Sequence, residues 1–444
     1  MNYPNTPGVK VKEVSTLPPS IVQVSTAIPV FLGYTEKGPL LEAVRITSFK
    51  EFEDIFGSTF SYTFSIDASD LVTAPTDFNL FFNEAIRMYF FNGGGACHII
   101  AVEHHSTYIA LDDAHFVNGI NLIDKLDEPT LIAFPEAVGL AKADYDTVVS
   151  AALSISNDTK DKFTLIDSPT DSDLLDFNSD IGVQPLGLTA FRNGITANLS
   201  YGAVYFPDLL VNLNYSYDET ASAYNGVTLK VLRDSNHADY PKAIALIDAA
   251  HQVVLPPSSL IAGVYAKVDR EKGVWAAPAN VSLQGVIKPT RAISDALQNE
   301  LNVDAGTGKS INAIREFAGK GTVVWGARTL AGNSNEWRYI QVRRLFMTVE
   351  ESVKKATSQF VFENNDAKTW VKVSSMIRSY LNGLWKEGAL TGATPEEAYF
   401  VQIGLGTTMT EMDVLEGKMI VKIGIAAVRP AEFIVLEFSH FVNQ

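Results

Sequence analysis

Short apolar stretches alternate with longer amphipathic stretches between residues 100 and 255, and this alternation restricts the fold more than any other feature. The apolar stretches have the length and composition of buried strands, whereas the longer ones repeat their apolar residues with helical spacing. In chain order they read PTLIAFPE, YDTVVSAALSISNDTK, KFTLIDSP, YGAVYFPDLLV and YPKAIALIDAAHQV. Strands that alternate with helices form βαβ units in a mostly parallel sheet, so we expect an inserted α/β domain at 100–255.

The charge of the chain is concentrated in much the same region. The 444 residues carry a net charge of −16, and 19 acidic residues against 6 basic ones lie between Glu103 and Lys230. The residues after Lys230 are close to neutral. Such an uneven distribution favours domains with different surroundings, and the negative balance argues against nucleic acid as a partner. A chain of this length also exceeds a single ordinary core, so more than one domain is expected.

The flanking regions predict a mixed α+β structure. The stretch SFKEFEDIFG predicts a short helix, since Ser48 can cap its first turn, Glu51 stands three residues later and Gly57 follows its last turn. Further helices are expected in DFNLFFNEAIRMYFFNGG, RYIQVRRLFMTVEESVKKATSQFV and AKTWVKVSSMIRSYLNGLWKEGAL. Strands are expected in AIPVFLGYTEKGP, ACHIIAVE, GKGTVVWGARTL, AYFVQIGLG and KMIVKIGIAAVRPAEFIVLEFSHFV.

Both ends of the chain carry strand-like sequences outside these regions. In TPGVKVKEVS, Val9 and Val11 alternate with lysines, and the following TLPPS interrupts any ladder because proline has no N–H. A terminal strand separated from the body by a stiff spacer has the composition of an arm. Its N–H and C=O groups can pair with the sheet edge of another chain, which is β-augmentation. Pairing within the same chain is the alternative that the sequence leaves open.

The stretch DAGTGKSINA raises the question of a nucleotide site. Gly308, Lys309 and Ser310 match the end of a phosphate loop, but the position five residues before Gly308, which needs a glycine, is Val303. The preceding ISDALQNELNVD is helix-like and polar rather than an apolar strand. A structural turn is the favoured interpretation, and we predict no nucleotide or other cofactor.

Other candidates for chemistry are also incomplete. His98, His104 and His105 lack the i, i+4 spacing of helical zinc sites, so we predict no metal. Cys97, the single cysteine, stands in an apolar strand and is not expected to act as a nucleophile. The absence of a second cysteine fits folding in a reducing cytoplasm.

The polar loop RDSNHADYP supplies the alternative to a purely structural protein. Asp234 and His237 could carry acid–base chemistry in a hydrolase of the α/β domain, although the sequence offers no nucleophile beside them. A solvated loop is the favoured interpretation. We also expect no secretory signal and no membrane insertion, because MNYPNTPGVK has no basic region before an apolar core and no apolar run approaches the roughly 20 residues that span a bilayer.

The stretch QVRRLFMTVEESVKKA concentrates positive charge on one predicted helix. Its basic residues are Arg343, Arg344, Lys354 and Lys355. Pairs with the interleaved Glu350 and Glu351 explain much of this pattern. A basic face that meets an acidic partner is the second interpretation, so these four residues are kept as candidate contacts.

Several long stretches resemble the contractile tail sheath proteins of phages and of phage-tail-like injection systems. The resemblance is carried by YPNTPGVKVKEVS, VSTAIPVFLGYTEKGP, LPPSSLIAGVYAKVDREKGVWAAPANVSLQGV, INAIREFAGKGTVVWGARTL, WRYIQVRRLFMTVEESV, FENNDAKTWVKVSSMIRSYLNGLWKEGALTGATPEEAYFVQIG and VRPAEFIVLEF. It covers roughly residues 1–60 and 250–444 in collinear order, whereas the middle resembles the family only in general character.

The resemblance implies a multidomain α/β and α+β protein with a structural role. An α+β sheath core would be built from residues 26–99 and 256–430, the second part facing an inner tube. The acidic α/β insertion at 100–255 would form the outer surface. Residues 1–25 would form an N-terminal arm and linker, and residues 431–444 a C-terminal strand or arm.

The resemblance also implies that both arms are lent to neighbouring subunits, over about Pro7–Val14 and about Phe433–Val442. The arm residues expected at subunit contacts are Val9, Val11, Val14, Phe433, Val435, Phe438 and Phe441. Arg343, Arg344, Lys354 and Lys355 become candidate contacts with the tube or with the sheath lattice.

The implied assembly is a helical homo-polymer around an inner tube protein, in contact with baseplate and terminator or cap proteins. It would be assembled in the bacterial cytoplasm as part of a phage tail or a phage-tail-like particle. Contraction of an extended, higher-energy lattice would drive the tube through a target envelope. No catalytic residue is implied.

Overall fold

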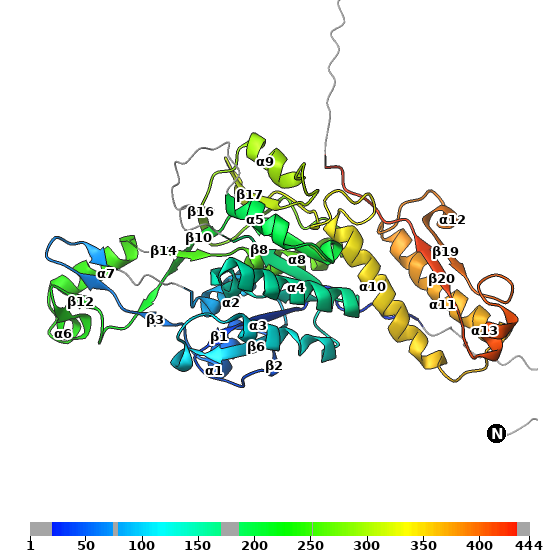
Figure 1. Ribbon diagram of the computed structural model, residues 1–444, viewed down its shortest axis with the longest axis horizontal. Helices are drawn as coiled ribbons and strands as arrows, with labels where there is room; N and C mark the ends of the chain where they lie inside the picture. The colour runs from blue at the N-terminus through cyan, green and yellow to red at the C-terminus, as the bar shows by residue number, and fades with distance from the viewer. Residues whose placement is uncertain (1–19, 74–78, 170–185, 251, 433–444) are drawn as a thin grey trace, which may run out of the picture. The chain divides into compact units, whose positions relative to one another are not determined.

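The computed structural model describes residues 20–73, 79–169, 186–250 and 252–432 (Figure 1). The chain divides into two compact units. Among the described residues, a large unit spans 25–348 and 429–432, and a small unit spans 20–24 and 349–428. The chain therefore passes from one unit to the other three times along its sequence.

A nine-stranded sheet forms the centre of the large unit. Its strands, in spatial order, are β15 (Val281–Ser282), β18 (Gly321–Val324), β17 (Asn312–Phe317), β9 (Gly202–Phe206), β8 (Phe163–Asp167), β7 (Leu131–Ala133), β1 (Pro29–Thr35), β6 (Cys97–His104) and β2 (Ala43–Ile46). The six strands from β17 to β6 are parallel, and β2 and β18 join by antiparallel pairing. The near-continuous apolar sequence of β1, PVFLGYT, fits a strand covered on both faces.

Helices cover both faces of this sheet. They are α1 (Phe49–Phe56), α2 (Phe82–Phe91), α3 (Asp113–Ile120), α4 (Lys142–Thr159), α5 (Leu186–Gly194), α8 (Ser258–Lys272) and α9 (Asp295–Asn302). Helix α2 packs against α8, and α3 packs against α4. A Cβ added at Gly33 of β1 would meet Phe82 of α2, whereas the neighbouring Leu32 contacts Gly119 of α3. Because successive strand residues point to opposite faces, the two helix pairs lie on opposite sides of the sheet.

Local sequence signals predicted many of these elements correctly. Ser48 Oγ accepts a hydrogen bond from Glu51 N at 3.2 Å and caps α1, and Gly57 ends it with a φ of 92°. The predicted strands at β1, β6, β7, β8, β9 and β18 are present, as are the helices α2, α4 and α10 (Ile340–Thr357).

The predicted boundaries of the α/β insertion are wrong. Residue 100 falls inside β6, which pairs directly with β1, so the segments 26–99 and 100–255 share one sheet. Strand β9 also pairs with β17, which draws residues 312–317 into the same sheet. The acidic composition of 103–230 therefore marks part of a common core and not a separate domain.

A smaller lobe of the large unit is built from two distant excursions of the chain (Figure 1). Its strands are β3 (Ser61–Tyr62), β4 (Ser65–Ile66), β5 (Val72–Thr73), β11 (Ser216–Tyr217), β12 (Ala223–Tyr224) and β13 (Val227–Thr228), with helices α6 (Leu229–Asp234) and α7 (Asp239–Ala250). The excursions meet through parallel pairs, β3 with β11 and β4 with β12. A three-stranded sheet of β14 (Gln252–Leu255), β10 (Leu209–Asn214) and β16 (Val286–Pro289) also belongs to this unit.

The small unit is an α+β structure. It contains the end of α10, then α11 (Ala367–Lys386), α12 (Pro395–Ala398), β19 (Tyr399–Gln402), α13 (Glu411–Leu415) and β20 (Lys422–Ile425). Both long helices were predicted from their apolar spacing. Asp366 caps α11, since its side chain accepts a hydrogen bond from Thr369 N at 2.9 Å.

Candidate assembly surfaces

Arg344 is buried inside the large unit. Its guanidinium donates two hydrogen bonds to Asp269, at 2.9 and 2.6 Å, and a third to Thr26 O at 2.7 Å. The guanidinium carbon also lies 4.7 Å from the centre of the Tyr265 ring. Only 3% of the Arg344 side chain is exposed. A bidentate buried pair of this kind fixes α10 to α8 and to the start of the core.

Arg343 is buried as well, but between aromatic rings. Its guanidinium carbon lies 4.1 Å from the centre of the Tyr201 ring and 4.5 Å from that of Trp337. Such stacking is typical of arginine, whose planar cation is weakly hydrated. The expectation that Arg343 and Arg344 contact a tube or a lattice neighbour is therefore corrected: both side chains are enclosed by residues of their own chain.

Lys354 and Lys355 lie in the small unit, on the last turn of α10. Lys354 Nζ is 3.0 Å from Glu351 Oε2, and Lys355 Nζ is 3.9 Å from Glu351 Oε1. The Lys354 side chain is 72% exposed. Their role as contacts with a partner stays a prediction.

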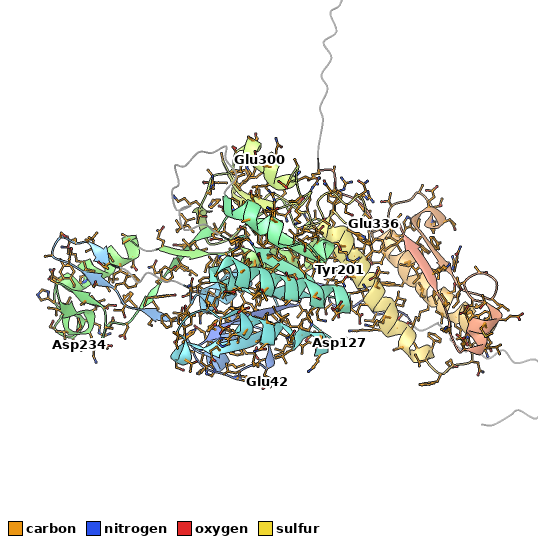
Figure 2. The ribbon with its side chains drawn as sticks, in the orientation of Figure 1. Glu42, Asp127, Tyr201, Asp234, Glu300 and Glu336 are labelled. Carbon is orange, nitrogen blue, oxygen red and sulfur yellow. The ribbon has the colours of Figure 1, made fainter. Side chains whose placement is uncertain are left out.

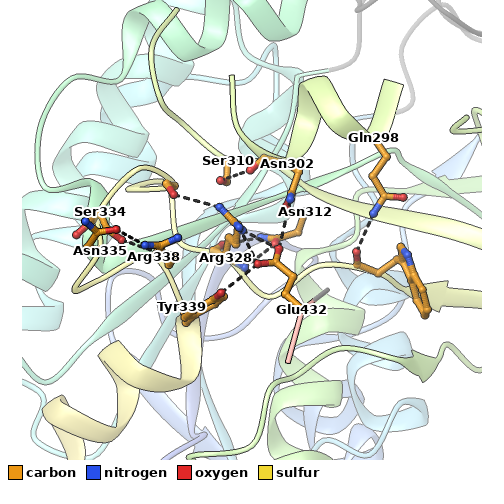
Figure 3. A network of polar contacts seen from close by, with 12 residues as sticks. Gln298, Asn302, Ser310, Asn312, Arg328, Ser334, Asn335, Arg338, Tyr339 and Glu432 are labelled. Atoms are coloured by element: carbon orange, nitrogen blue, oxygen red, sulfur yellow. Dashed lines mark hydrogen bonds and ion pairs between the residues drawn. The ribbon is translucent and has the colours of Figure 1, made fainter. Parts of the chain in front are cut away.

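The C-terminal segment is anchored to the large unit at Glu432, the last described residue (Figure 3). Its carboxylate accepts hydrogen bonds from Arg328 Nε at 2.8 Å and Arg328 Nη2 at 2.6 Å. Tyr339 Oη and Asn302 Nδ2 donate to it at 3.1 and 3.3 Å. Burial alone would raise the pKa of Glu432, but the hydrogen bonds and the charge of Arg328 lower it below its ordinary value.

Arg328 is held in position by a second set of contacts. Asn312 Oδ1 accepts a hydrogen bond from Arg328 N at 2.8 Å, and Asn312 Nδ2 donates to Arg328 O at 2.8 Å (Figure 3). Arg328 Nη1 donates to Gly332 O at 3.1 Å. No local sequence signal predicts this anchor, because Arg328 and Glu432 are 104 residues apart and neither position has a local motif.

The predicted arm residues lie outside the described part of the chain. They are Val9, Val11, Val14, Phe433, Val435, Phe438 and Phe441. The structure describes the residues from which the two predicted arms would extend. Val24 N donates to Ser352 Oγ at 3.1 Å in the small unit, and Glu432 is bound to Arg328 in the large unit.

A two-stranded antiparallel sheet in the small unit has unpaired edges within the described residues. Strands β19 and β20 pair with each other, with Val401 opposite Ile423, and neither has another strand partner in that part of the chain. Arg378 Nη2 donates to Val401 O at 2.6 Å. An isolated hairpin-sized sheet is marginal by itself, and open strand edges readily accept another strand.

Large apolar side chains are exposed over the same unit. They are Val361, Phe362, Val371, Phe400, Leu405, Met412 and Leu415. Single exposed apolar residues are common on monomers, but this number within about 55 residues is typical of a surface that becomes covered by other chains.

The candidate catalytic and nucleotide-site residues are either exposed to solvent or hydrogen-bonded to the backbone of their own chain. Asp234 lies at the surface of the lobe (Figure 2), where Arg233 Nε is 3.3 Å from its carboxylate. His237 is also exposed, with Nδ1 at 3.5 Å from Asp239. Lys309 is buried and donates a hydrogen bond to Arg192 O, and Ser310 donates to Asn302 O.

The described residues contain neither a metal-binding cluster nor a membrane-spanning helix. Among them, no group of three or more His, Cys, Asp or Glu side chains is arranged to hold a metal ion. None of the helices described for this chain combines the length and the apolar character that crossing a bilayer requires. Cys97 is fully buried in β6, and burial raises the pKa of its thiol.

Two family models match the chain. Residues 210–330 match the phage tail sheath protein central domain, and residues 333–440 match the phage tail sheath C-terminal domain. Among curated proteins, the tail sheath protein of Vibrio phage KVP40 is 30% identical over 136 residues. That alignment covers 31% of this chain and 20% of the phage protein, so the chain matches only about a fifth of that relative's length.

Solved structures match over nearly the whole chain. The sheath complex of an extracellular contractile injection system, PVC, in its contracted state is 33% identical, with a TM-score of 0.69. The match covers 100% of this chain and 99% of that one. The helical sheath of the anti-feeding prophage (AFP), also contracted, is 34% identical with a TM-score of 0.68, covering 98% and 99%.

Proposed function

The chain belongs to the contractile tail sheath family, and from this membership we propose that it is the subunit of a contractile sheath. Copies of the chain would polymerise helically around an inner tube. The observation that carries the proposal is the likeness to contracted sheaths over almost the entire length of both chains. Because those two sheaths belong to phage-tail-like systems, we propose that this chain serves an injection particle of that type.

Contraction requires no chemical step by the subunit. A head-to-tail interface that does not close on itself builds an open helical lattice. A lattice assembled in an extended, higher-energy packing can relax cooperatively to a shorter one, and the difference in free energy drives the tube forward. We propose no catalytic residue, since the named relatives are structural sheath proteins.

The terminal arms supply the proposed joints between subunits. Residues 7–14 and 433–442 would add to the edges of β19 and β20 in neighbouring copies, with Val9, Val11, Val14, Phe433, Val435, Phe438 and Phe441 at the contacts. The unpaired edges of β19 and β20 and the exposed Phe400 support this proposal. Each added backbone hydrogen bond contributes about 1 kcal/mol, so a ladder of several forms a firm joint.

The wider set of partners follows from the same proposal. Besides other copies of itself, the chain would contact an inner tube protein, a baseplate and a terminator or cap protein. Assembly in the bacterial cytoplasm is proposed with them. The AFP baseplate, in whose structure a chain 34% identical to this one is present, supports the baseplate contact.

Deletion of residues 1–14 tests the arm model. The deleted protein is expected to fold, since the contacts described for both units are made by residues 20–432, but to fail to form tubes. Sedimentation and electron microscopy measure tube formation, and circular dichroism measures folding. A full-length Val9→Ile variant, which keeps an apolar strand residue, is the matched control and should polymerise. Normal tubes from the deleted chain would contradict the arm model.

A further inference from the structure

The order of the parallel strands in the large unit reverses at β1. Counted along the chain, β1 is the first parallel strand, β6 the second and β7 the third, but β1 lies between the other two in space. Helix α2, before β6, covers one face of the sheet, whereas α4, after β7, lies on the opposite face. In doubly wound sheets, ligands bind beyond the carboxyl ends of the two strands at such a reversal. In this chain those strands are β1 and β7.

A mostly apolar pocket of about 310 Å³ lies in the large unit. Its aromatic lining residues are Phe60, Tyr62 and Tyr108, and its polar ones are Ser61, Thr63 and Asn79. None of the described residues that line it is charged. A pocket of this volume accommodates a small molecule, and aromatic walls with a few polar groups are typical of ligand sites.

The pocket lies beside the reversal of strand order. Tyr108 follows the carboxyl end of β6, and its ring centre is 5.5 Å from that of Tyr34 near the end of β1. Leu80, which also lines the pocket, directly precedes Phe81, and Phe81 N donates a hydrogen bond to Glu136 shortly beyond β7. Strands β1, β6 and β7 therefore all end near the pocket.

The aromatic walls are fixed by other residues of the same chain. The ring centre of Phe60 lies 4.9 Å from that of Tyr62 and 5.4 Å from that of His105. Tyr62 Oη donates a hydrogen bond to Leu80 O at 3.1 Å, and its ring lies 5.3 Å from that of Tyr215. Because these rings are held in place before a ligand arrives, less entropy is lost on binding.

A buried carboxyl of the chain itself occupies the place where an anion would bind. Glu136 is fully buried, and its two oxygens accept hydrogen bonds from Tyr34 N, Phe81 N and Phe82 N. Free N–H groups at a helix N-terminus are a common phosphate site, but these N–H groups of α2 are already paired. Together with the uncharged lining, this favours an uncharged ligand.

We propose that this pocket binds a small uncharged molecule with one flat aromatic ring. Such a ring stacks offset or edge-to-face on side chains such as Phe60 and Tyr108. Ser61 Oγ lies 3.0 Å from Ser216 Oγ, so part of the polar lining is already paired, and a sugar with many hydroxyls fits poorly. One polar substituent on the ring suits the side chain of Asn79. The pocket lies within one chain, so its test does not depend on the proposed sheath role.

Photoaffinity labelling of the full-length chain tests this site. The probe is phenol with a diazirine group at the para position, and mass spectrometry of peptides locates the label. We expect label at residues 60–63, 79–80 and 108. Matched benzoate and cyclohexanol probes should label about tenfold less, because the first adds a charge and the second lacks a flat ring. Label spread over the surface, or equal labelling by all three probes, would overturn the proposal.

Two phenylalanine variants provide a matched comparison. Phe60→Ala removes one aromatic wall and should reduce labelling by phenol about tenfold. Phe91→Ala should leave it unchanged, since Phe91 is 62% exposed on α2 and does not line the pocket. Circular dichroism measures whether both variants fold. If Phe60→Ala does not fold, competition in the wild-type chain decides: excess unlabelled phenol should remove the label, and label that persists would contradict the proposal.

The same probe separates a free molecule from an aromatic side chain of another copy. We expect equal labelling of dispersed subunits and of assembled tubes. Label that is present in dispersed subunits and absent from tubes would overturn the choice of a small molecule, because a neighbouring chain would then fill the pocket.

Discussion

Two buried carboxyl groups join strands to helix N-termini in the large unit. Glu136 Oε2 accepts a hydrogen bond from Tyr34 N of β1 at 2.7 Å, and its Oε1 accepts from Phe81 N and Phe82 N at 2.8 and 2.9 Å. Asp167, at the end of β8, accepts from Ser258 N, the first residue of α8, at 2.7 Å. Burial raises the pKa of each carboxyl to about 8, despite these N–H donors.

The stability of the large unit should therefore fall as pH rises. The folded pKa values lie above the ordinary values of 4.5 and 3.8, so the folded state holds these protons more tightly than the unfolded state. Their contribution is fully present below about pH 4 and is lost as pH rises through about 8. We expect the free energy of unfolding to fall by about 1 kcal/mol per pH unit for each group between pH 6 and 8.

Urea unfolding at several pH values measures this dependence. Glu136→Gln removes one titrating group, so its unfolding free energy should fall less steeply with pH than that of the wild type. The glutamine amide also places an N–H donor among three N–H donors, so the variant should be less stable than the wild type below about pH 4, and this difference should shrink as pH rises. The quantity compared is the slope of unfolding free energy against pH. If the slope of the variant equals that of the wild type, Glu136 does not titrate with a raised pKa in the folded state.

Among the secondary-structure elements, the C-terminal ends of helices α5 and α9 are each capped by a buried cation from the other helix or from the residues that follow it. Arg192, in the last turn of α5, donates hydrogen bonds to Glu300 O and Leu301 O at the end of α9, at 2.9 and 3.1 Å. Lys309, shortly after α9, donates back to Arg192 O at the end of α5. A cation near the last carbonyls of a helix satisfies them and complements the helix dipole. The lysine of the GTGKS sequence therefore has a structural role.

Lys309→Met should destabilise the large unit. The methionine keeps the apolar stem but leaves the carbonyl oxygen of Arg192 without this donor, which costs about 1–3 kcal/mol. The midpoint of urea unfolding is expected to fall accordingly. Lys320→Met, at an exposed position, is the matched control and should leave the midpoint almost unchanged. Equal midpoints for the two variants would show that the cap contributes nothing.

Elements were predictable from the sequence where the signal was local. Ser48, Glu51 and Gly57 predicted α1, because a helix cap acts on residues three and four positions away along the chain. The order of the sheet was not predictable, since β1 lies between β7 and β6, and β9 lies beside β17 more than 100 residues later. The apolar sequence of a buried strand does not indicate which other strand it pairs with.

At the scale of the whole molecule, the predicted domain boundaries and the predicted basic face failed for the same reason: local sequence signals do not reveal long-range contacts. Charge composition suggested an insertion at 100–255, but sheet pairing places its strands β7, β8 and β9 in the nine-stranded sheet of the large unit. The basic pattern of α10 suggested one contact face, yet Tyr201, Trp337 and Asp269 enclose two of its four cations. Tyr201 and Asp269 come from distant parts of the sequence, so no periodicity within α10 could reveal them.

Because Arg343 and Arg344 are enclosed, we predict that among the four cations of α10 only Lys354 and Lys355, at its end, contribute to contacts between chains. Replacing Lys354 and Lys355 by glutamine should weaken binding to an acidic partner and reduce the salt dependence of sheath assembly on the tube, compared by sedimentation at about 50 and 500 mM salt. Lys368→Gln with Lys372→Gln, both on exposed positions of α11, is the matched control. Arg344→Gln should act differently, because it leaves Asp269 buried without its cation and should lower the thermal midpoint. If the Lys354 and Lys355 variant assembles with the wild-type salt dependence, the remaining basic contact is also excluded, and the joints between subunits must depend on the arms and the exposed apolar surface.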